Sequence, residues 1–248
     1  MIILAASALF VAGCPVPVTP NTPVPYRYET DPVTGRGFFV YVPSTYSHAR
    51  PTPLIISCHG SPPFDVAEHH IREWKWYGEQ YGCIIVAPSL VGTEGILGDG
   101  PLAGMWENER FILSIISLLG YRYNLDRANI MITGFSGGGF PTYWVGLRHP
   151  DVFSVIIARS CNFSVHNADG WYPPEARDTP IFVYYGDSEP GAIIDQSQKA
   201  IQYLISKNFK VESRVLPALG HQRRPDVAME FFTRHMHPPK PSLPAAPW

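Results

Sequence analysis

The sequence lacks a surplus of charge of either sign. It contains 19 Lys and Arg against 21 Asp and Glu, for a formal net charge of −2, and only 16% of its residues are charged. Proteins that bind nucleic acid or anionic membrane surfaces carry clustered basic residues that attract the phosphates. Nucleic acid is therefore not expected as a partner, and the folded chain has no electrostatic reason to bind a membrane.

Long hydrophobic runs are also lacking, because no uninterrupted run reaches the roughly 20 residues that span a bilayer. The longest candidate is the N-terminal MIILAASALFVAGC, an apolar stretch ending in small residues, which is typical of an export signal although no Lys or Arg precedes it. Val11-Ala12-Gly13-Cys14 resembles the lipobox of bacterial lipoproteins. That resemblance implies a signal peptide over residues 1–13, lipid on Cys14, and an exported protein that is anchored at the cell envelope or secreted. The alternative is an ordinary buried strand.

Cysteine is scarce, with four in 248 residues, and the spacing matches no zinc pattern. If Cys14 carries lipid, an odd number remains: Cys58, Cys83 and Cys161. Each lies in or just after an apolar run, so we expect buried free thiols, with one disulfide in an oxidising compartment as the alternative.

The chain is long enough, and hydrophobic enough at 45%, to bury one large core. Proline recurs throughout residues 14–26 and 238–248, which predicts an extended tether and a tail. Residues 27–237 remain as a single domain.

Within that domain, short β-rich runs alternate with segments of helical periodicity. Strands are predicted at GFFVYVP, LIISC, CIIVAP, IMITGF, FSVIIARS, IFVYYG and VESRVLP. Helices are predicted around residues 66–80, 106–122, 139–148, 194–208 and 226–236. Runs that are apolar at consecutive positions suit strands buried on both faces of a mostly parallel sheet. The alternation predicts an α/β fold, a three-layer sandwich.

The stretch ITGFSGGGF places glycines around one serine between a predicted strand and a predicted helix. It lacks the Lys-Ser/Thr of a phosphate-binding P-loop, and its glycines do not match the G-x-G-x-x-G dinucleotide pattern. It fits G-x-S-x-G, with Gly134, Ser136 and Gly138, in which small neighbours let a strained turn present the serine hydroxyl. Ser136 is thus a candidate nucleophile, and the Gly137 N–H at the helix start is a candidate oxyanion donor.

A serine nucleophile needs a histidine base and an acid that orients it. His221, in a loop between the last strand and the last helix, is the candidate base. His69 with His70, and His235 with His237, are expected on solvated faces. In LIISCHGSPP, Gly60 after His59 would let the chain turn so that the Ser61 N–H becomes a second oxyanion donor.

The stretch YRYNLDRANIMITGFSGGGFPTYWVGLRHPDVFSVIIARS, together with the order of serine and histidine, resembles the α/β-hydrolase superfamily. Within it, the chain resembles the polyhydroxybutyrate depolymerases and the feruloyl and acetylxylan esterases. The resemblance implies Ser136 as nucleophile, His221 as base, an acid after the strand IFVYYG, and no metal or cofactor. The group's Gly-x-x-Asp pattern favours Glu189 over Asp187 in YYGDSEPG, with Asp195 third.

The activity implied is hydrolysis of a small-molecule or polymeric carboxylic ester through an acyl-enzyme. Aromatic residues near the predicted site could line a substrate pocket or belong to the core: Phe64, Trp106, Phe163, Trp171 and Tyr172. A serine peptidase or acyltransferase with the same triad, and a non-catalytic envelope binding protein that keeps the fold, remain as alternatives.

Overall fold

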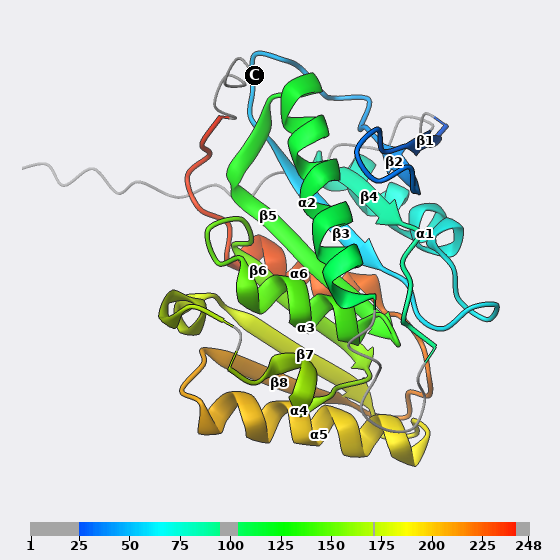
Figure 1. Cartoon of the computed structure of the whole chain (residues 1–248), viewed down its shortest axis with the longest axis vertical. Coiled ribbons are helices and arrows are strands. Elements are labelled where there is room, and N and C mark those ends of the chain that lie inside the picture. The colour runs from blue at the N-terminus through cyan, green and yellow to red at the C-terminus, as the bar shows by residue number, and fades with distance from the viewer. Residues whose placement is uncertain (1–24, 95–103, 171, 242–248) are drawn as a thin grey trace, which may run out of the picture.

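The computed structural model describes residues 25–94, 104–170 and 172–241, which form one eight-stranded sheet covered by helices (Figure 1). The spatial order is β1-β2-β4-β3-β5-β6-β7-β8. β1 and β2 run antiparallel to their neighbours, and the remaining pairs are parallel. The strands are β1 (Arg27–Thr30), β2 (Gly37–Tyr41), β3 (Thr52–Cys58), β4 (Ile84–Pro88), β5 (Leu125–Ser136), β6 (Val155–Cys161), β7 (Ile181–Gly186) and β8 (Val211–Leu216).

Helices lie on both faces of the sheet (Figure 1). α2 (Met105–Arg122), α3 (Gly139–Arg148) and α5 (Gly191–Ser206) contribute to one hydrophobic cluster, which contains Phe111, Trp144 and Leu204. α1 (Ala67–Tyr81) and α6 (Pro225–Arg234) pack on the opposite face around Trp74 and Phe231. This arrangement confirms the predicted three-layer α/β fold.

The parallel strands are largely buried, as a sheet covered on both faces requires. Every residue of β4, β6 and β7 is buried. Parallel strands end at the same edge of the sheet, so the register brings together the carboxyl ends of β3, β5 and β6, with Cys58 paired to Gly134 and Ser136 to Cys161. Residues that follow these strands therefore meet at one edge, where sites of open α/β sheets form.

Three short elements were not among those predicted. β1 is an edge strand with an exposed pattern, and α4 (Val165–Ala168) and the 3-10 helix η1 (Pro174–Asp178) each span about one turn. Such elements bury too little to leave a periodic pattern.

The segment after residue 237, predicted as a tail, stays in contact with the domain through Lys240. The His237 N–H donates to Asn129 Oδ1 (2.8 Å), the Lys240 N–H donates to Asp126 Oδ1 (2.8 Å), and the Arg127 N–H donates to the Lys240 carbonyl (2.8 Å). The start of β5, with Asp126, Arg127 and Asn129, therefore supplies the polar partners of this proline-rich segment.

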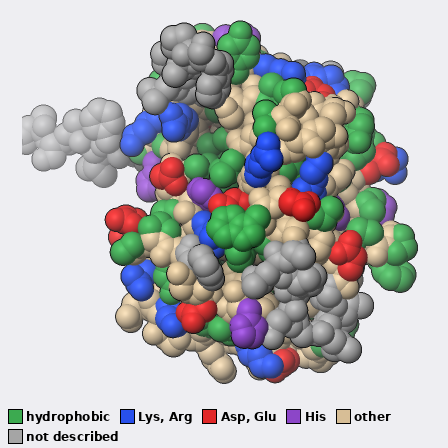
Figure 2. All heavy atoms as spheres, in the orientation of Figure 1, with side chains coloured by type: hydrophobic (Ala, Val, Ile, Leu, Met, Phe, Trp, Pro, Cys, Tyr) green, Lys and Arg blue, Asp and Glu red, His purple; other side chains and the backbone are tan. Residues whose placement is uncertain are grey.

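Acidic and basic side chains are interspersed on the face seen in Figure 2, in keeping with the near-neutral net charge. None of the helices in the described ranges is long and apolar enough to cross a membrane.

Candidate functional site

Ser136 is the last residue of β5, and it adopts a left-handed backbone conformation with φ +52°. A non-glycine residue in this region is strained, and such strain concentrates at functional sites. The turn is tightly packed: a Cβ on Gly134 would lie 2.3 Å from Thr142 Oγ1, and one on Gly138 would lie 2.3 Å from the Cys58 carbonyl oxygen. Glycine is therefore required on both sides of the serine, and α3 begins directly afterwards at Gly139.

His221 and Glu189 form a close pair at the same edge of the sheet. His221 Nδ1 lies 2.6 Å from Glu189 Oε2. The Glu189 side chain is fully buried, whereas the His221 side chain is 32% exposed. The imidazole is therefore partly accessible to solvent, and its carboxylate partner is not. The His221 ring also lies against Phe135, with ring centroids 4.5 Å apart, and Phe135 precedes Ser136. These contacts hold His221 beside the strained serine turn.

Asp187, the second carboxylate after β7, has a different environment. Its side chain is exposed and accepts a hydrogen bond from the Ser188 hydroxyl (2.9 Å), and its N–H donates to the Leu216 carbonyl (3.0 Å). Asp195 pairs with Lys199 on an exposed face of α5. Of the three candidate carboxylates, the structure brings Glu189 to the imidazole.

The turn after β3 lies against the serine turn. A Cβ on Gly60 would approach Ser136 Cβ to 3.1 Å, and one on Gly137 would approach Ser61 Oγ to 2.9 Å. The Gly60 N–H donates to Asp65 Oδ2 (2.8 Å), so Gly60 itself is not an oxyanion donor. The Ser61 hydroxyl donates to the Thr93 carbonyl (2.6 Å). Gly60 therefore serves as the turn, and the Ser61 and Gly137 N–H groups stay the candidate donors.

His59 is buried and has a structural environment. Its Nε2 accepts from the Leu90 N–H (2.9 Å), so its Nδ1, 2.7 Å from the Gly60 carbonyl, carries the proton. Burial lowers the pKa of His59, which favours the neutral ring that these two bonds require.

The candidate substrate-binding aromatics fall into different settings. Phe163 is 5% exposed and packs against Tyr143 and Tyr203, which fits the core alternative for this ring. Tyr172 packs against Phe209 beside the same core. The others are Phe64, 84% exposed on the segment after the Ser61 turn, Trp106, 54% exposed and in contact with Trp144, and Trp171, which lies outside the described residues.

Cys58, Cys83 and Cys161 are free and buried, as predicted, and burial raises the pKa of each thiol to about 12. Cys14 lies outside the described residues, so its lipid and the export of the chain stay predictions. The described ranges contain no group of His, Cys, Asp and Glu side chains that could hold a metal ion.

A polar network next to the site was not predicted from the sequence. The expectation that His70 lies on a solvated face is wrong. The His70 side chain is 0% exposed, with Nε2 2.8 Å from Asp65 Oδ2 and Nδ1 2.7 Å from Ser57 Oγ. The signal was present in the helical spacing: His70 lies on the same face of α1 as Ala67 and Trp74, three and four residues away.

Comparisons with known proteins agree with this architecture. The family model for phospholipases/carboxylesterases matches residues 110–237, more than half of the chain. The bifunctional acetylxylan esterase/xylanase XynS20E of Neocallimastix patriciarum is 29% identical over 116 residues, which cover 47% of this chain and 16% of that protein. The chain thus spans only a small part of this curated relative.

Solved structures share the fold at low sequence identity. The ferulic acid esterase AmCE1/Fae1A of Anaeromyces mucronatus, in complex with ferulic acid, superposes with a TM-score of 0.63 at 14% identity, covering 88% of this chain and 93% of that chain. Porphyromonas gingivalis dipeptidyl peptidase 4 gives a TM-score of 0.62 at 14% identity, covering 87% of this chain and 36% of that chain. Because an esterase and a peptidase match equally well, these likenesses show the fold alone. The family match decides the relationship: this chain belongs to the phospholipase/carboxylesterase family of α/β-hydrolases.

Proposed function

We propose that this protein hydrolyses carboxylic esters, with Ser136 as nucleophile, His221 as general base and Glu189 as the acid that orients the base. The observation that carries the proposal is the strained Ser136, at φ +52° on the central strand, beside a histidine whose Nδ1 lies 2.6 Å from a fully buried carboxylate. A serine on a strained turn and a histidine with a buried carboxylate partner at the same sheet edge are the arrangement that this chemistry requires. Membership of a carboxylesterase family supports the same activity.

The reaction proceeds in two halves. Ser136 Oγ forms a bond to the ester carbonyl carbon while His221 Nε2 takes the hydroxyl proton. The carbon–oxygen bond to the alcohol then breaks, and the same proton leaves with the alcohol. Water attacks the acyl-enzyme with His221 again as base, which releases the acid and restores Ser136. Glu189 stabilises the imidazolium that forms in each half.

The negative charge that develops on the carbonyl oxygen needs preorganised donors. The Gly137 N–H, where the turn enters α3, and the Ser61 N–H, on the turn packed against it, are the groups proposed here. A donor of this kind contributes about 3–4 kcal/mol to lowering the barrier. No cofactor is required for this chemistry.

The names of the similar proteins suggest the substrate class. One relative is described as an acetylxylan esterase/xylanase and one structural neighbour as a ferulic acid esterase. We therefore propose acetyl or feruloyl esters, including those carried on polysaccharides, as substrates. The exposed ring of Phe64, close in sequence to the Ser61 turn, is the aromatic side chain best placed to contact such a substrate.

Fluorophosphonate labelling with peptide mapping, combined with steady-state kinetics, tests the proposal. The wild-type protein should be labelled at Ser136 and should hydrolyse p-nitrophenyl acetate, methyl ferulate or acetylated xylan. Ser136→Ala should lose both labelling and turnover, whereas Ser188→Ala, which removes an exposed hydroxyl that contacts Asp187, should keep both. A label on another serine, or full turnover by Ser136→Ala, would contradict the assignment. Turnover of dipeptide p-nitroanilides in place of the esters would identify a peptidase instead.

A further inference from the structure

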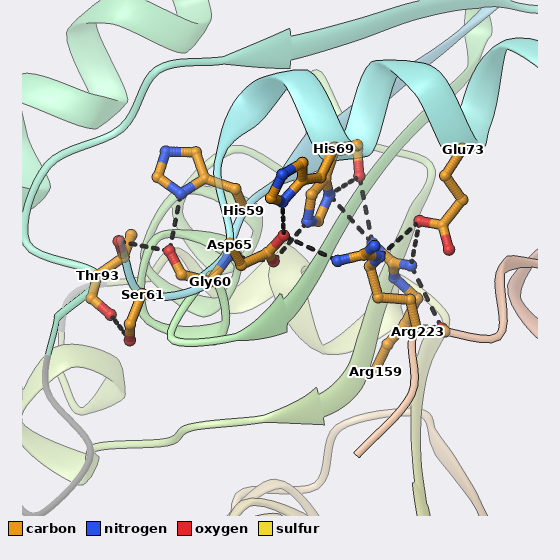
Figure 3. A network of polar contacts seen from close by, with 12 residues as sticks. His59, Gly60, Ser61, Asp65, His69, Glu73, Thr93, Arg159 and Arg223 are labelled. Carbon is orange, nitrogen blue, oxygen red and sulfur yellow. Dashed lines mark hydrogen bonds and ion pairs between the residues drawn. The ribbon is translucent and has the colours of Figure 1, made fainter. Parts of the chain in front are cut away.

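A group of polar and charged side chains, here called the Asp65 network, lies next to the Gly60 turn (Figure 3). The His70 and Arg159 side chains are fully buried, whereas those of Glu73 and Arg223 are 20% and 30% exposed. Its members are Asp65, His70, Glu73, Arg159 and Arg223. Two carboxylates face two guanidinium groups, with Arg223 Nε 3.3 Å and Arg159 Nη1 3.7 Å from Glu73 Oε2. Arg159 is 0% exposed, so this charge is fully removed from water. Buried charges are costly unless they are paired, which makes such a network informative about function.

Asp65 is the member that contacts both the turn after β3 and Arg223. Its Oδ2 accepts from the Gly60 N–H (2.8 Å) and lies 2.8 Å from His70 Nε2, and its Oδ1 accepts from Arg223 Nη1 (2.9 Å). Burial alone would raise the pKa of Asp65, but the hydrogen bond and charge of His70, the Gly60 N–H and Arg223 hold it well below its usual range. The lowered pKa favours the ionised carboxylate near neutral pH.

The first connection runs from Asp65 to the Ser61 turn. Gly60 lies between the carboxylate and the serine, because a Cβ on Gly60 would be 3.1 Å from both Asp65 Oδ2 and Ser136 Cβ. Thr93 Oγ1 donates to the Gly60 carbonyl (2.8 Å), so the peptide group on either side of Gly60 is fixed. Asp65 thus fixes the peptide that precedes Gly60, while Thr93 Oγ1 and His59 Nδ1 contact the Gly60 carbonyl of the next peptide, which carries the Ser61 N–H.

The second connection runs from Asp65 to the loop that carries His221. Arg223 lies two residues beyond the histidine, and its guanidinium carbon is 5.7 Å from the centroid of the Phe135 ring on which His221 packs. The backbone of this loop is fixed as well, since the Arg223 carbonyl accepts from Tyr184 Oη (3.2 Å) and Arg159 Nη1 (3.3 Å). Figure 3 shows Asp65 between the Gly60 turn and the Arg223 side chain.

We propose that Asp65 is a positioning residue that holds the Ser61 oxyanion turn and the His221 loop in register with Ser136. This inference rests on the proposed function, since it assigns a role within that site. Asp65 acts through Gly60 and Arg223 and does not itself touch the reacting atoms. Because both connections serve the transition state, their loss should lower kcat and leave KM nearly unchanged.

Kinetics of Asp65→Asn and Asp65→Ala test the inference, with Asp195→Asn, an exposed carboxylate paired to Lys199, as the matched control. Misplacement of a catalytic group by about 1 Å costs about 100-fold in rate, so we expect Asp65→Ala to lose at least about 100-fold in kcat with KM within about 3-fold. Asp65→Asn keeps one acceptor oxygen and should lose less. Affinity for a trifluoromethyl ketone, which forms the tetrahedral adduct, should fall in parallel with kcat, while Asp195→Asn should match the wild type.

Circular dichroism and thermal melts establish that each variant is folded. If Asp65→Ala is unfolded, the kcat of Asp65→Asn tests the inference. If neither variant folds, the kcat of Arg223→Gln tests it, because this change removes the contact to Asp65 Oδ1. Wild-type kcat in a folded decisive variant overturns the inference, as does a loss confined to KM, and either result leaves the proposed function intact. A wild-type protein that neither hydrolyses esters nor is labelled at Ser136 overturns the proposed function instead.

Discussion

Replacing Glu189 with Gln should remove the charge that stabilises His221 while keeping the shape of the side chain. Glu189 Oε2 lies 2.6 Å from His221 Nδ1, and its side chain is fully buried. Two unit charges about 4 Å apart attract by about 4 kcal/mol at an effective dielectric constant of about 20. This energy corresponds to about three orders of magnitude in rate. The Gln amide NH2 can also donate to His221 Nδ1 and stabilise the wrong tautomer, which brings the expected fall in kcat to between about 10³ and 10⁴.

The matched control is Asp187→Asn, which makes the same change of charge on the exposed carboxylate two residues earlier. Steady-state kinetics on p-nitrophenyl acetate should show the collapse for Glu189→Gln and nearly wild-type kcat for Asp187→Asn. The comparison is valid when both variants have wild-type circular dichroism. If Asp187→Asn collapses while Glu189→Gln stays near the wild type, Asp187 is the triad acid and the reasoning from burial and contact is refuted.

Two further predictions concern the turn and the buried histidine. Gly137→Ala would place a Cβ 1.9 Å from the Thr93 carbonyl oxygen, so the turn must shift. Because an oxyanion donor then moves, kcat should fall by about 10²–10³. The control Gly191→Ala, which has open space around its Cβ, should keep the wild-type kcat. Burial lowers the pKa of His70 from 6.5 to about 4, so between these values the unfolded chain binds more protons than the native state. The free energy of unfolding should therefore fall by about 3 kcal/mol as the pH drops from 6.5 to 4, and urea titrations of His70→Gln should show a shallower fall.

The sequence predicted most of the architecture because its central strands have an unmistakable pattern. Runs such as Ile84–Pro88 are apolar at consecutive positions and are bounded by turns, which only a strand buried on both faces accommodates. The elements it missed carry no such pattern: Arg27–Thr30 is an exposed edge strand whose place comes from pairing with Gly37–Tyr41. Edge strands are specified by their neighbours rather than by their own hydrophobicity.

The candidate site could be predicted where its parts are local. The spacing around Ser136 is a property of one turn, and Glu189 and His221 each follow a recognisable strand. The Asp65 network could not be predicted in this way, because Asp65 and Arg223 are separated by 158 positions and meet only in the folded sheet. A charged stretch of helix suggested solvent for His70, whereas helical periodicity placed it on the buried face. Where the charged composition of a helix and its hydrophobic periodicity disagree, the periodicity indicates which side chains are buried.

The structure contains another set of contacting serine, histidine and aspartate side chains, away from Ser136. It shows that residue types alone do not identify a catalytic triad. Ser57 Oγ lies 2.7 Å from His70 Nδ1, and His70 Nε2 lies 2.8 Å from Asp65 Oδ2. Its geometry would satisfy a search for a triad, but Ser57 and His70 are 0% exposed, so no substrate reaches them. Burial also lowers the pKa of His70 to about 4, which makes the ring a weak base, and Arg159 Nη2 donates to the Ser57 hydroxyl (3.2 Å) and would resist transfer of its proton. At Ser136 the opposite conditions hold: a strained turn at the sheet edge, a partly exposed imidazole and a buried carboxylate behind it. We therefore expect fluorophosphonate to label Ser136 and not Ser57, and peptide mapping of the adduct distinguishes the two serines.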